Sequence, residues 1–243
     1  MSARIALVTG ASRGIGAATA LALARAGAHV VAVARTVGGL EELDDAVRAV
    51  GGSATLVPLD MTDFAGLARL AGALKERYGR LDILVGNAAV AGPSSPLDHI
   101  TLKDWEEVMK VNVTANWQLI CAMDGLLRRS DAGRAVFLTS GAPRNMRPYR
   151  GLYATSKAAL EAVVRTYAAE TERTAVRVNL FDPGPTRTRM RAQVMPGEDP
   201  MTLPPPEQAA ERIVALCMPK FSETGRIYDF RARKLMPLVL SEE

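Results

Sequence analysis

Short apolar runs alternate with longer amphipathic stretches along most of the chain. Residues 4–10, 29–35, 54–60, 81–87, 134–140 and 175–181 are apolar and rich in β-branched residues, and 226–230 is a shorter run of the same kind. Helical composition or spacing of apolar residues marks 17–27, 40–52, 63–79, 105–127 and 153–172. These patterns predict strands and helices in alternation. Because the strands lack polar alternation, each should be buried on both faces, as in a parallel sheet.

Repeated strand–helix units predict a doubly wound parallel sheet of about seven strands with helices on both faces. No linker is visible, so we expect residues 1–243 to form a single Rossmann-like α/β domain. Residues 191–208 are dense in proline and glycine, which is typical of an insertion or a mobile lid. We place a substrate lid at about 189–206; the last dozen residues show no clear pattern.

Composition and charge narrow the class of protein. Thirty basic and 26 acidic residues give a formal net charge of +4, and aromatic residues make up only 5% of the chain. Scattered arginines and few aromatics disfavour a nucleic-acid binder. No signal peptide and no apolar segment near the ~20 residues of a membrane helix is apparent, so we expect a cytoplasmic protein without a membrane partner.

Cys121 and Cys217, with His29 and His99, lack the spacing of a metal site, so no metal is expected. Both cysteines are interpreted as core residues.

A glycine-rich loop follows the first predicted strand. The stretch TGASRGIG places Gly10, Gly14 and Gly16 between that strand and the next helix. Glycine lets the backbone turn tightly and approach a pyrophosphate, whose charge is favoured by the helix N-terminus. This position between a strand and a helix favours a dinucleotide site over a glycine-rich turn without a ligand.

The stretch GLYATSK places Tyr153 four residues before Lys157, so a helix would present both on one face. The same spacing also fits an idle surface pair. In the chemical interpretation, the Lys157 ammonium stabilises the phenolate and lowers the pKa of Tyr153. Tyr153 would then act as a general acid or base. Ser140, at the end of the fifth predicted strand, would hydrogen-bond the substrate oxygen as negative charge develops on it.

Together these motifs resemble the short-chain dehydrogenase/reductase family. TGASRGIG, the Tyr-x-x-x-Lys of YATSK, a serine 13 residues before Tyr153, the VNV stretch and DPGPTRT occur in the family's order between about Arg4 and Thr188. The resemblance implies that Asn112, Ser140, Tyr153 and Lys157 are the catalytic residues. It also implies that Lys157 holds the nicotinamide ribose and that Asn112 supports a water linking Lys157 to solvent. The chain departs from the family at 86–89, where Gly-Asn-Ala-Ala replaces the usual Asn-Asn-Ala-Gly.

The same motifs indicate where a nicotinamide cofactor would bind. An NAD enzyme usually carries an acidic residue after its second strand, whereas here Arg35 follows the strand and the first acid is Glu41. Arg13 in the glycine loop is a second cation, and two guanidinium groups suit a ribose 2′-phosphate. NADP(H) is therefore expected in preference to NAD(H). The predicted cofactor-binding residues are Gly10, Ser12, Arg13, Gly14, Ile15, Gly16, Arg35, Asp60, Met61, Asn87, Tyr153, Lys157, Pro183, Gly184, Thr186 and Thr188.

The leading functional prediction is an NADPH-dependent carbonyl reductase that converts a ketone or aldehyde to an alcohol. Two alternatives stay open: an NAD(P)-dependent alcohol dehydrogenase working oxidatively, and a non-catalytic dinucleotide-binding regulator. Three arginines, Arg144, Arg147 and Arg150, lie between Ser140 and Tyr153. An acidic or phosphorylated substrate follows if one of them points inward. In similar proteins the helices at 105–127 and 153–172 form a four-helix bundle across a two-fold axis, so a homodimer or homotetramer is expected.

Overall fold

The computed structural model describes residues 3–237, so the ends of the predicted 1–243 domain and the last six residues of the tail lie outside it. Eight strands form one sheet in the order β3-β2-β1-β4-β5-β6-β7-β8. The strands are β1 Ile5–Thr9, β2 His29–Ala34, β3 Ser53–Pro58, β4 Ile83–Gly86, β5 Arg134–Leu138, β6 Arg177–Asp182, β7 Arg226–Asp229 and β8 Lys234–Pro237. All neighbouring pairs are parallel except β7 and β8. The predicted doubly wound α/β fold is confirmed, with one antiparallel edge strand added.

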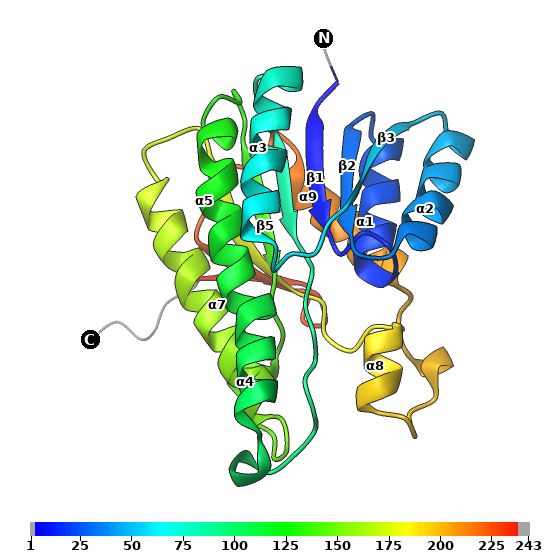
Figure 1. Cartoon of the computed structure of the whole chain (residues 1–243), viewed down its shortest axis with the longest axis vertical. Coiled ribbons are helices and arrows are strands. Elements are labelled where there is room, and N and C mark those ends of the chain that lie inside the picture. The colour runs from blue at the N-terminus through cyan, green and yellow to red at the C-terminus, as the bar shows by residue number, and fades with distance from the viewer. Residues whose placement is uncertain (1–2, 238–243) are drawn as a thin grey trace.

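Helices cover both faces of this sheet (Figure 1). One face carries α1 Gly14–Arg25, α2 Val37–Ala49 and α9 Pro206–Cys217. The other carries α3 Phe64–Tyr78, α5 Ala115–Leu127 and α7 Gly151–Glu170, and α4 Leu102–Met109 continues the line of α5 beyond the sheet. Two short helices, α6 Ala142–Asn145 and α8 Arg189–Val194, follow the carboxyl ends of β5 and β6.

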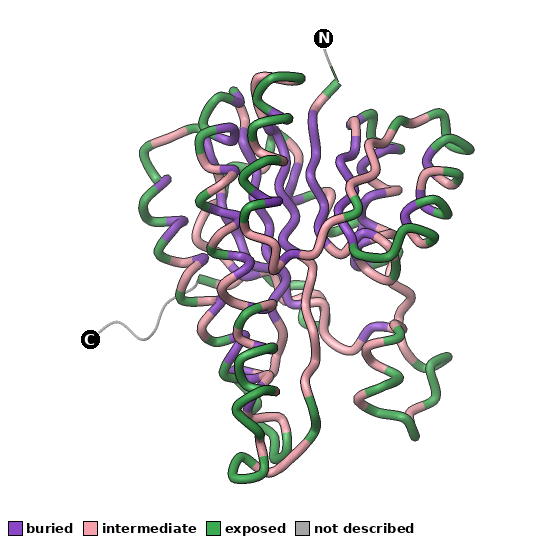
Figure 2. Tube along the Cα trace, in the orientation of Figure 1, coloured by how far each residue is buried: buried purple, intermediate pink, exposed green. Residues whose placement is uncertain are grey.

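Strand residues divide between two cores by simple alternation. Along β1, Ile5 and Leu7 join the core under α3, α5 and α7, whereas Ala6 and Val8 join the core under α1, α2 and α9. Side chains of successive strand residues point to opposite faces, so a strand covered on both sides must be apolar throughout. Figure 2 shows the result, with buried strands between helices whose outer faces are exposed.

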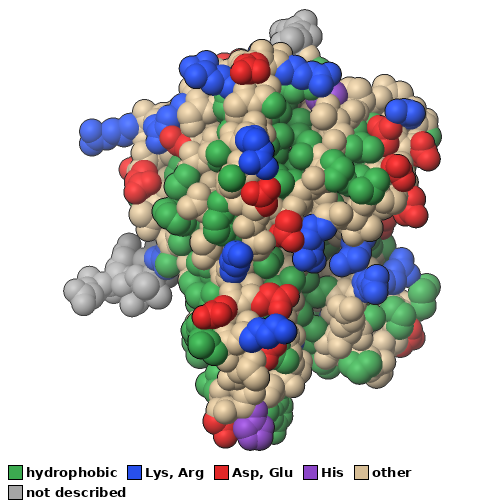
Figure 3. All heavy atoms as spheres, in the orientation of Figure 1, with side chains coloured by type: hydrophobic (Ala, Val, Ile, Leu, Met, Phe, Trp, Pro, Cys, Tyr) green, Lys and Arg blue, Asp and Glu red, His purple; other side chains and the backbone are tan. Residues whose placement is uncertain are grey.

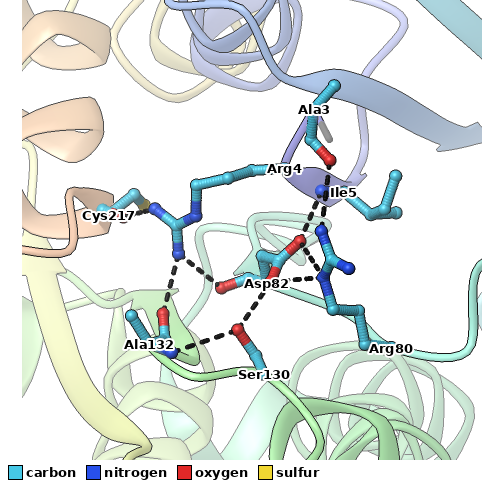
Figure 4. Close-up of polar contacts among 8 residues, drawn as sticks. All are labelled: Ala3, Arg4, Ile5, Arg80, Asp82, Ser130, Ala132 and Cys217. Atoms are coloured by element: carbon cyan, nitrogen blue, oxygen red, sulfur yellow. Dashed lines mark hydrogen bonds and ion pairs between the residues drawn. The ribbon is translucent and has the colours of Figure 1, made fainter. Parts of the chain in front are cut away.

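The amino-terminal edge of the sheet is held by a buried polar network (Figure 4). The Asp82 carboxylate accepts hydrogen bonds from the Ile5 amide (2.8 Å), the Ser130 hydroxyl (2.6 Å) and Arg80 Nε (3.1 Å). Arg4 donates to the carbonyl oxygens of Cys217 (2.6 Å), Asp82 (3.0 Å) and Ala132 (2.7 Å). These bonds join the starts of β1 and β4 to the end of α9, at the edge opposite the carboxyl ends of the strands.

The structure differs from the sequence-based elements in four places. Helix α9 was not predicted, although its buried residues Ala209, Ala210, Ile213 and Leu216 show helical spacing. Strand β8 lies in the tail to which no pattern was assigned, so the sheet has eight strands rather than about seven. The predicted helix at 105–127 begins at Leu102 and contains a π-helical turn at Lys110–Thr114. Cys121 is exposed on α5, so its interpretation as a core residue was wrong, whereas Cys217 is buried.

No helix within residues 3–237 is long and apolar enough to cross a membrane. Within the same range, no group of three or more His, Cys, Asp or Glu side chains is arranged to hold a metal ion.

Candidate active site

A cleft opens at the carboxyl ends of β1 and β4, where the strand order reverses. This is the position at which open α/β sheets bind ligands. The cleft has a volume of about 350 Å³. Lys and Arg side chains gather on the surface between the body of the molecule and the segment around α8 (Figure 3). The predicted residues that line the cleft are Gly10, Ser12, Arg13, Gly14, Ile15, Arg35, Asp60, Met61, Asn87, Tyr153, Lys157, Pro183 and Thr188.

Five other predicted site residues are not part of this lining: Gly16, Asn112, Ser140, Gly184 and Thr186. Gly16 packs against the glycine loop itself, because a Cβ added there would stand 2.2 Å from the Gly10 carbonyl oxygen and 2.4 Å from Asn87 Nδ2. Asn87 uses that space to donate hydrogen bonds to the carbonyl oxygens of Thr9 (2.9 Å) and Gly10 (3.2 Å). The absence of a side chain at Gly16 thus lets Asn87, in the loop after β4, hydrogen-bond to the loop after β1 and hold it in place.

Backbone conformation explains the glycines of the first loop. Gly10 and Gly14 have φ angles of +65° and +57°, a region that side chains with a Cβ rarely adopt. The turn they form delivers the N-terminus of α1 to the cleft. Arg13, the residue preceding α1, makes no side-chain capping hydrogen bond, and the first turn carries no acidic residue. The unsatisfied amides and the helix dipole therefore favour an anion such as a pyrophosphate at this end.

Two cations lie toward the β2 side of the same cleft. Arg13 and Arg35 both line it. Arg35 stands 3.6 Å from Asp60, but these side chains are 64% and 43% exposed, so the pair is weakly held. The residues present thus fit a dinucleotide, with guanidinium groups available for an additional phosphate. The preference for NADP(H) over NAD(H) stays a prediction.

Pro183, Gly184, Thr186 and Thr188 form the turn that carries the chain from β6 toward α8. Gly184 has a φ angle of +59°, and its amide donates to the Asp182 carboxylate at 2.9 Å. The Thr186 hydroxyl donates to the Pro183 carbonyl oxygen at 3.1 Å, and Thr188 Oγ1 accepts from the Arg191 amide at 3.2 Å. Pro183 and Thr188 reach the cleft, whereas Gly184 and Thr186 shape the turn behind it.

Tyr153 and Lys157 share one face of α7, as their spacing predicts, and both line the cleft. Burial raises the pKa of Tyr153 to about 12; the Arg150 charge and a hydrogen bond with the Ser140 side chain oppose that rise. The Lys157 amine donates to the Leu138 carbonyl oxygen at 2.8 Å, and its Nζ lies 5.8 Å from the centre of the Tyr153 ring. The cation that opposes burial at Tyr153 here is Arg150. The expectation that Lys157 lowers the pKa of Tyr153 stays a prediction.

Burial also acts on Lys157. It lowers the pKa of this ammonium to about 8, against the opposing charges of Glu161 and Asp182. Desolvation disfavours the charged form of any group, which raises the pKa of a phenol and lowers that of an amine. In this pair it leaves a neutral phenol next to an amine that changes charge near pH 8.

Asn112 is fully buried within the π-helical turn between α4 and α5. Its side chain accepts from the Val90 amide (2.8 Å) and donates to the Val90 carbonyl (2.9 Å) and to Ser156 Oγ (3.0 Å). These bonds hold the cleft-lining segment after β4 against α7. Single π-helical turns often occur at functional sites. The water relay implied for Asn112 stays a prediction, and the bonds seen here are those of a positioning residue.

An ionic network close to Lys157 was not predicted from the sequence. Arg144 forms ion pairs with the Asp182 carboxylate and with Glu161 (3.5 Å), and the Thr139 hydroxyl donates to Glu161 Oε1 at 2.6 Å. Burial raises the pKa of both Asp182 and Glu161. Glu161 follows Lys157 by four residues on α7, and that spacing could have indicated it. The partners on β6 and α6 carry no such signal.

The departures at 86–89 have a packing explanation. A Cβ at Gly86 would stand 2.3 Å from the Phe137 ring, so the glycine leaves room for a buried aromatic residue on the neighbouring strand. Ala89 lines the cleft beside Val90.

The predicted lid at 189–206 contains α8 and a 3-10 turn at Pro200–Thr202. Arg189, Met190 and Gln193 line the cleft. Arg191 donates two hydrogen bonds to the Glu198 carboxylate, at 2.5 and 2.7 Å, which tie the segment to itself. The segment therefore borders the site, and its movement as a lid stays a prediction.

Comparisons with known proteins agree with this geometry. The family model described as short chain dehydrogenase matches residues 4–199. An uncharacterized oxidoreductase of Escherichia coli, YciK, is 37% identical over 206 residues, covering 84% of this chain and 81% of the relative. A sepiapterin reductase of Chlorobaculum tepidum is 32% identical over 222 residues, covering 88% and 91%. A Mycobacterium tuberculosis relative named as an NAD-dependent oxidoreductase is 37% identical over 201 residues, covering 77% and 73%.

Solved structures show the same fold. A short chain dehydrogenase from Shigella flexneri, solved in complex with NADP, superposes with a TM-score of 0.90 at 35% identity. The match covers 94% of this chain and 97% of that chain.

Proposed function

Because this chain belongs to the short-chain dehydrogenase family, we propose that it is an NADPH-dependent reductase that converts a ketone or aldehyde to an alcohol, with Tyr153 as the general acid. One observation carries the proposal: Tyr153 and Lys157 line the same cleft as the glycine loop and the N-terminus of α1. A cofactor whose phosphates lie at that helix end can extend along the cleft toward the tyrosine. Arg13 and Arg35 on the cleft wall support the choice of NADPH.

Each polar group near the tyrosine has a task in this proposal. The nicotinamide would supply the hydride. Tyr153 would donate its phenolic proton to the carbonyl oxygen, and Ser140 would hydrogen-bond that oxygen as negative charge develops. Lys157 is held by the Leu138 carbonyl and would bind the cofactor ribose from there. Asn112 keeps the Val90 backbone in place on the opposite wall.

The protonated form of Tyr153 is the one that reduction requires. Reduction needs a proton donor, whereas alcohol oxidation needs a phenolate. With its pKa raised to about 12, Tyr153 is a neutral phenol over the whole physiological range. The oxidative alternative uses the same residues in reverse and would require that pKa to fall.

The direct test is a screen of aldehydes and ketones with NADPH and with NADH, followed by the nicotinamide absorbance. Tyr153→Phe should abolish turnover and leave cofactor binding intact, measured by fluorescence titration. Normal turnover in the Phe variant would refute the acid role. Tight NADPH binding with no turnover of any carbonyl compound would favour the dinucleotide-binding regulator instead.

We also propose that the protein self-associates through α5 and α7. On α5 the exposed positions Trp117, Cys121 and Gly125 are four residues apart, and on α7 the small residues Ala158, Ala162 and Ala169 are exposed. Trp117 is 49% exposed, which is high for so large an apolar side chain. Light scattering coupled to gel filtration should give a dimer or tetramer mass, and Ala162→Glu should shift it to that of a monomer.

A further inference from the structure

Three arginines lie between Ser140 and Tyr153, and the structure gives them three different surroundings. Arg144 is ion-paired with Asp182 and Glu161 behind the site. Arg147 is exposed. Arg150 is half-buried at the start of α7, where its guanidinium carbon lies 5.0 Å from the centre of the Tyr153 ring. Only the last of these is directed at the group that would react.

Arg150 has no carboxylate partner among the residues that the structure describes. The one hydrogen bond of its side chain within that range is from Nη1 to Ser94 Oγ, at 3.1 Å. Arg191, the nearby cation that adds repulsion, is itself neutralised by Glu198. Burial lowers the pKa of Arg150, which is the mark of a charge removed from water without full compensation. A guanidinium in such a place gains strongly from an anion.

The position of Arg150 shows which anion could reach it. Tyr153 borders the cleft, and Arg189, Met190 and Gln193 of the α8 segment line the cleft as well. A carbonyl compound held at the Tyr153 hydroxyl would lie beside the ring that Arg150 covers. A carboxylate a few bonds from the reacting carbon would then meet the guanidinium, whose planar fork matches a carboxylate in two parallel hydrogen bonds.

We propose that Arg150 is a specificity-determining residue that binds an acidic group of the substrate, so that the enzyme prefers carbonyl compounds carrying a carboxylate near the carbonyl. This inference rests on the proposed reductase function. It assigns the substrate class that the glycine loop and the Tyr153–Lys157 pair leave open.

The test compares two aldehydes that differ in one charge, 4-carboxybenzaldehyde and its methyl ester, each with NADPH. The quantity measured is the ratio of kcat/KM for the acid to that for the ester. Wild type should favour the acid, and Arg150→Gln should lower the ratio about ten- to a hundredfold, the loss of one charge-assisted hydrogen-bonding pair. Arg150→Lys should retain part of the preference, because the charge stays while the fork is lost. Any change in the acidity of Tyr153 affects both aldehydes alike and cancels in the ratio.

Arg147→Gln is the matched control, since it removes one positive charge three residues away on the exposed loop and should leave the ratio unchanged. An unchanged ratio in Arg150→Gln, or a wild-type preference for the ester, would overturn the proposal. Calorimetric binding of benzoate, with the uncharged benzamide for comparison, tests the anion site without requiring turnover. Benzoate binding that is lost in Arg150→Gln and kept in Arg147→Gln supports the anion site. If that result is obtained but neither aldehyde is reduced, the proposed reductase function is refuted while the anion site stands. Equal benzoate binding by both variants refutes the anion site.

Discussion

Gly16→Ala tests whether the nucleotide loop depends on close packing between two strand ends. The added Cβ would stand 2.2 Å from the Gly10 carbonyl oxygen and 2.4 Å from Asn87 Nδ2. Both separations are far shorter than a carbon can tolerate against oxygen or nitrogen. Gly10 cannot turn aside freely, because it is already held at a φ angle of +65°. The clash must therefore be relieved by moving Asn87 or by shifting the start of α1.

The magnitude follows from the bonds that relief would break. Asn87 Nδ2 donates to the Thr9 and Gly10 carbonyl oxygens at 2.9 and 3.2 Å. Each such bond contributes about 0.5–1.5 kcal/mol, so losing both costs about 1–3 kcal/mol, the usual range for overpacking. In a chain of this length each kcal/mol lowers Tm by about 2–4 °C, so the variant should melt about 2–12 °C below wild type. If the same ~1–3 kcal/mol instead destabilises the complex with NADPH, the Kd for NADPH should rise about five- to 150-fold.

Thermal unfolding followed by circular dichroism, together with NADPH titration by fluorescence, measures both effects. Gly72→Ala is the matched control, because Gly72 lies exposed in α3 with nothing within 4 Å of an added Cβ. Alanine there should leave NADPH binding unchanged and stabilise the helix by up to about 1 kcal/mol. A Gly16→Ala protein with wild-type Tm and wild-type NADPH affinity would refute the steric argument.

Three further predictions concern charge. Lys157 is protonated below its pKa of about 8 and neutral above it, so the KM for NADPH should rise as pH passes through 8; a KM that stays flat up to pH 10 would contradict the ribose-binding role. Arg35→Asp should weaken NADPH binding far more than NADH binding, and an unchanged ratio of the two affinities would contradict the phosphate assignment. Asp82→Asn removes the carboxylate that accepts from the Ile5 amide and Arg80, so urea titration should show a loss of about 1–3 kcal/mol of stability. Because Asp82 lies at the opposite edge of the sheet from the cleft, NADPH affinity should not change.

Local patterns were sufficient for most of the fold. Apolar strands without polar alternation indicated a sheet buried on both faces, and β1 shows it directly, with Leu7 and Val8 in different cores. The edge was harder to predict. Strand β8 is only four residues long, of which three are exposed, and it owes its strand conformation to pairing with β7. In helix α9 the buried residues Ala209, Ile213 and Leu216 show helical spacing, which could have predicted the helix. The proline-rich segment before it made the beginning of the helix hard to place.

The positions of the site residues could be predicted from the sequence, whereas their pKa values could not. Which residues meet on α7 follows from helical spacing alone, so Tyr153 and Lys157 could be placed together from the sequence. Their pKa values could not, because desolvation and through-space charges depend on groups brought in from other elements. Burial outweighs the neighbouring charges at both residues, and the cation that opposes it at Tyr153 is Arg150.

The sequence by itself thus determined the strand–helix alternation, the glycine loop and the Tyr153–Lys157 face, since each depends on residues close together in the chain. The tertiary structure alone decided how the three loop arginines differ. Arg144 forms ion pairs with acids on β6 and α7, whereas Arg150 lies over the Tyr153 ring with no acidic partner among residues 3–237. Electrostatic partners are chosen by distance in space, and distance in space is set only when the whole sheet has formed.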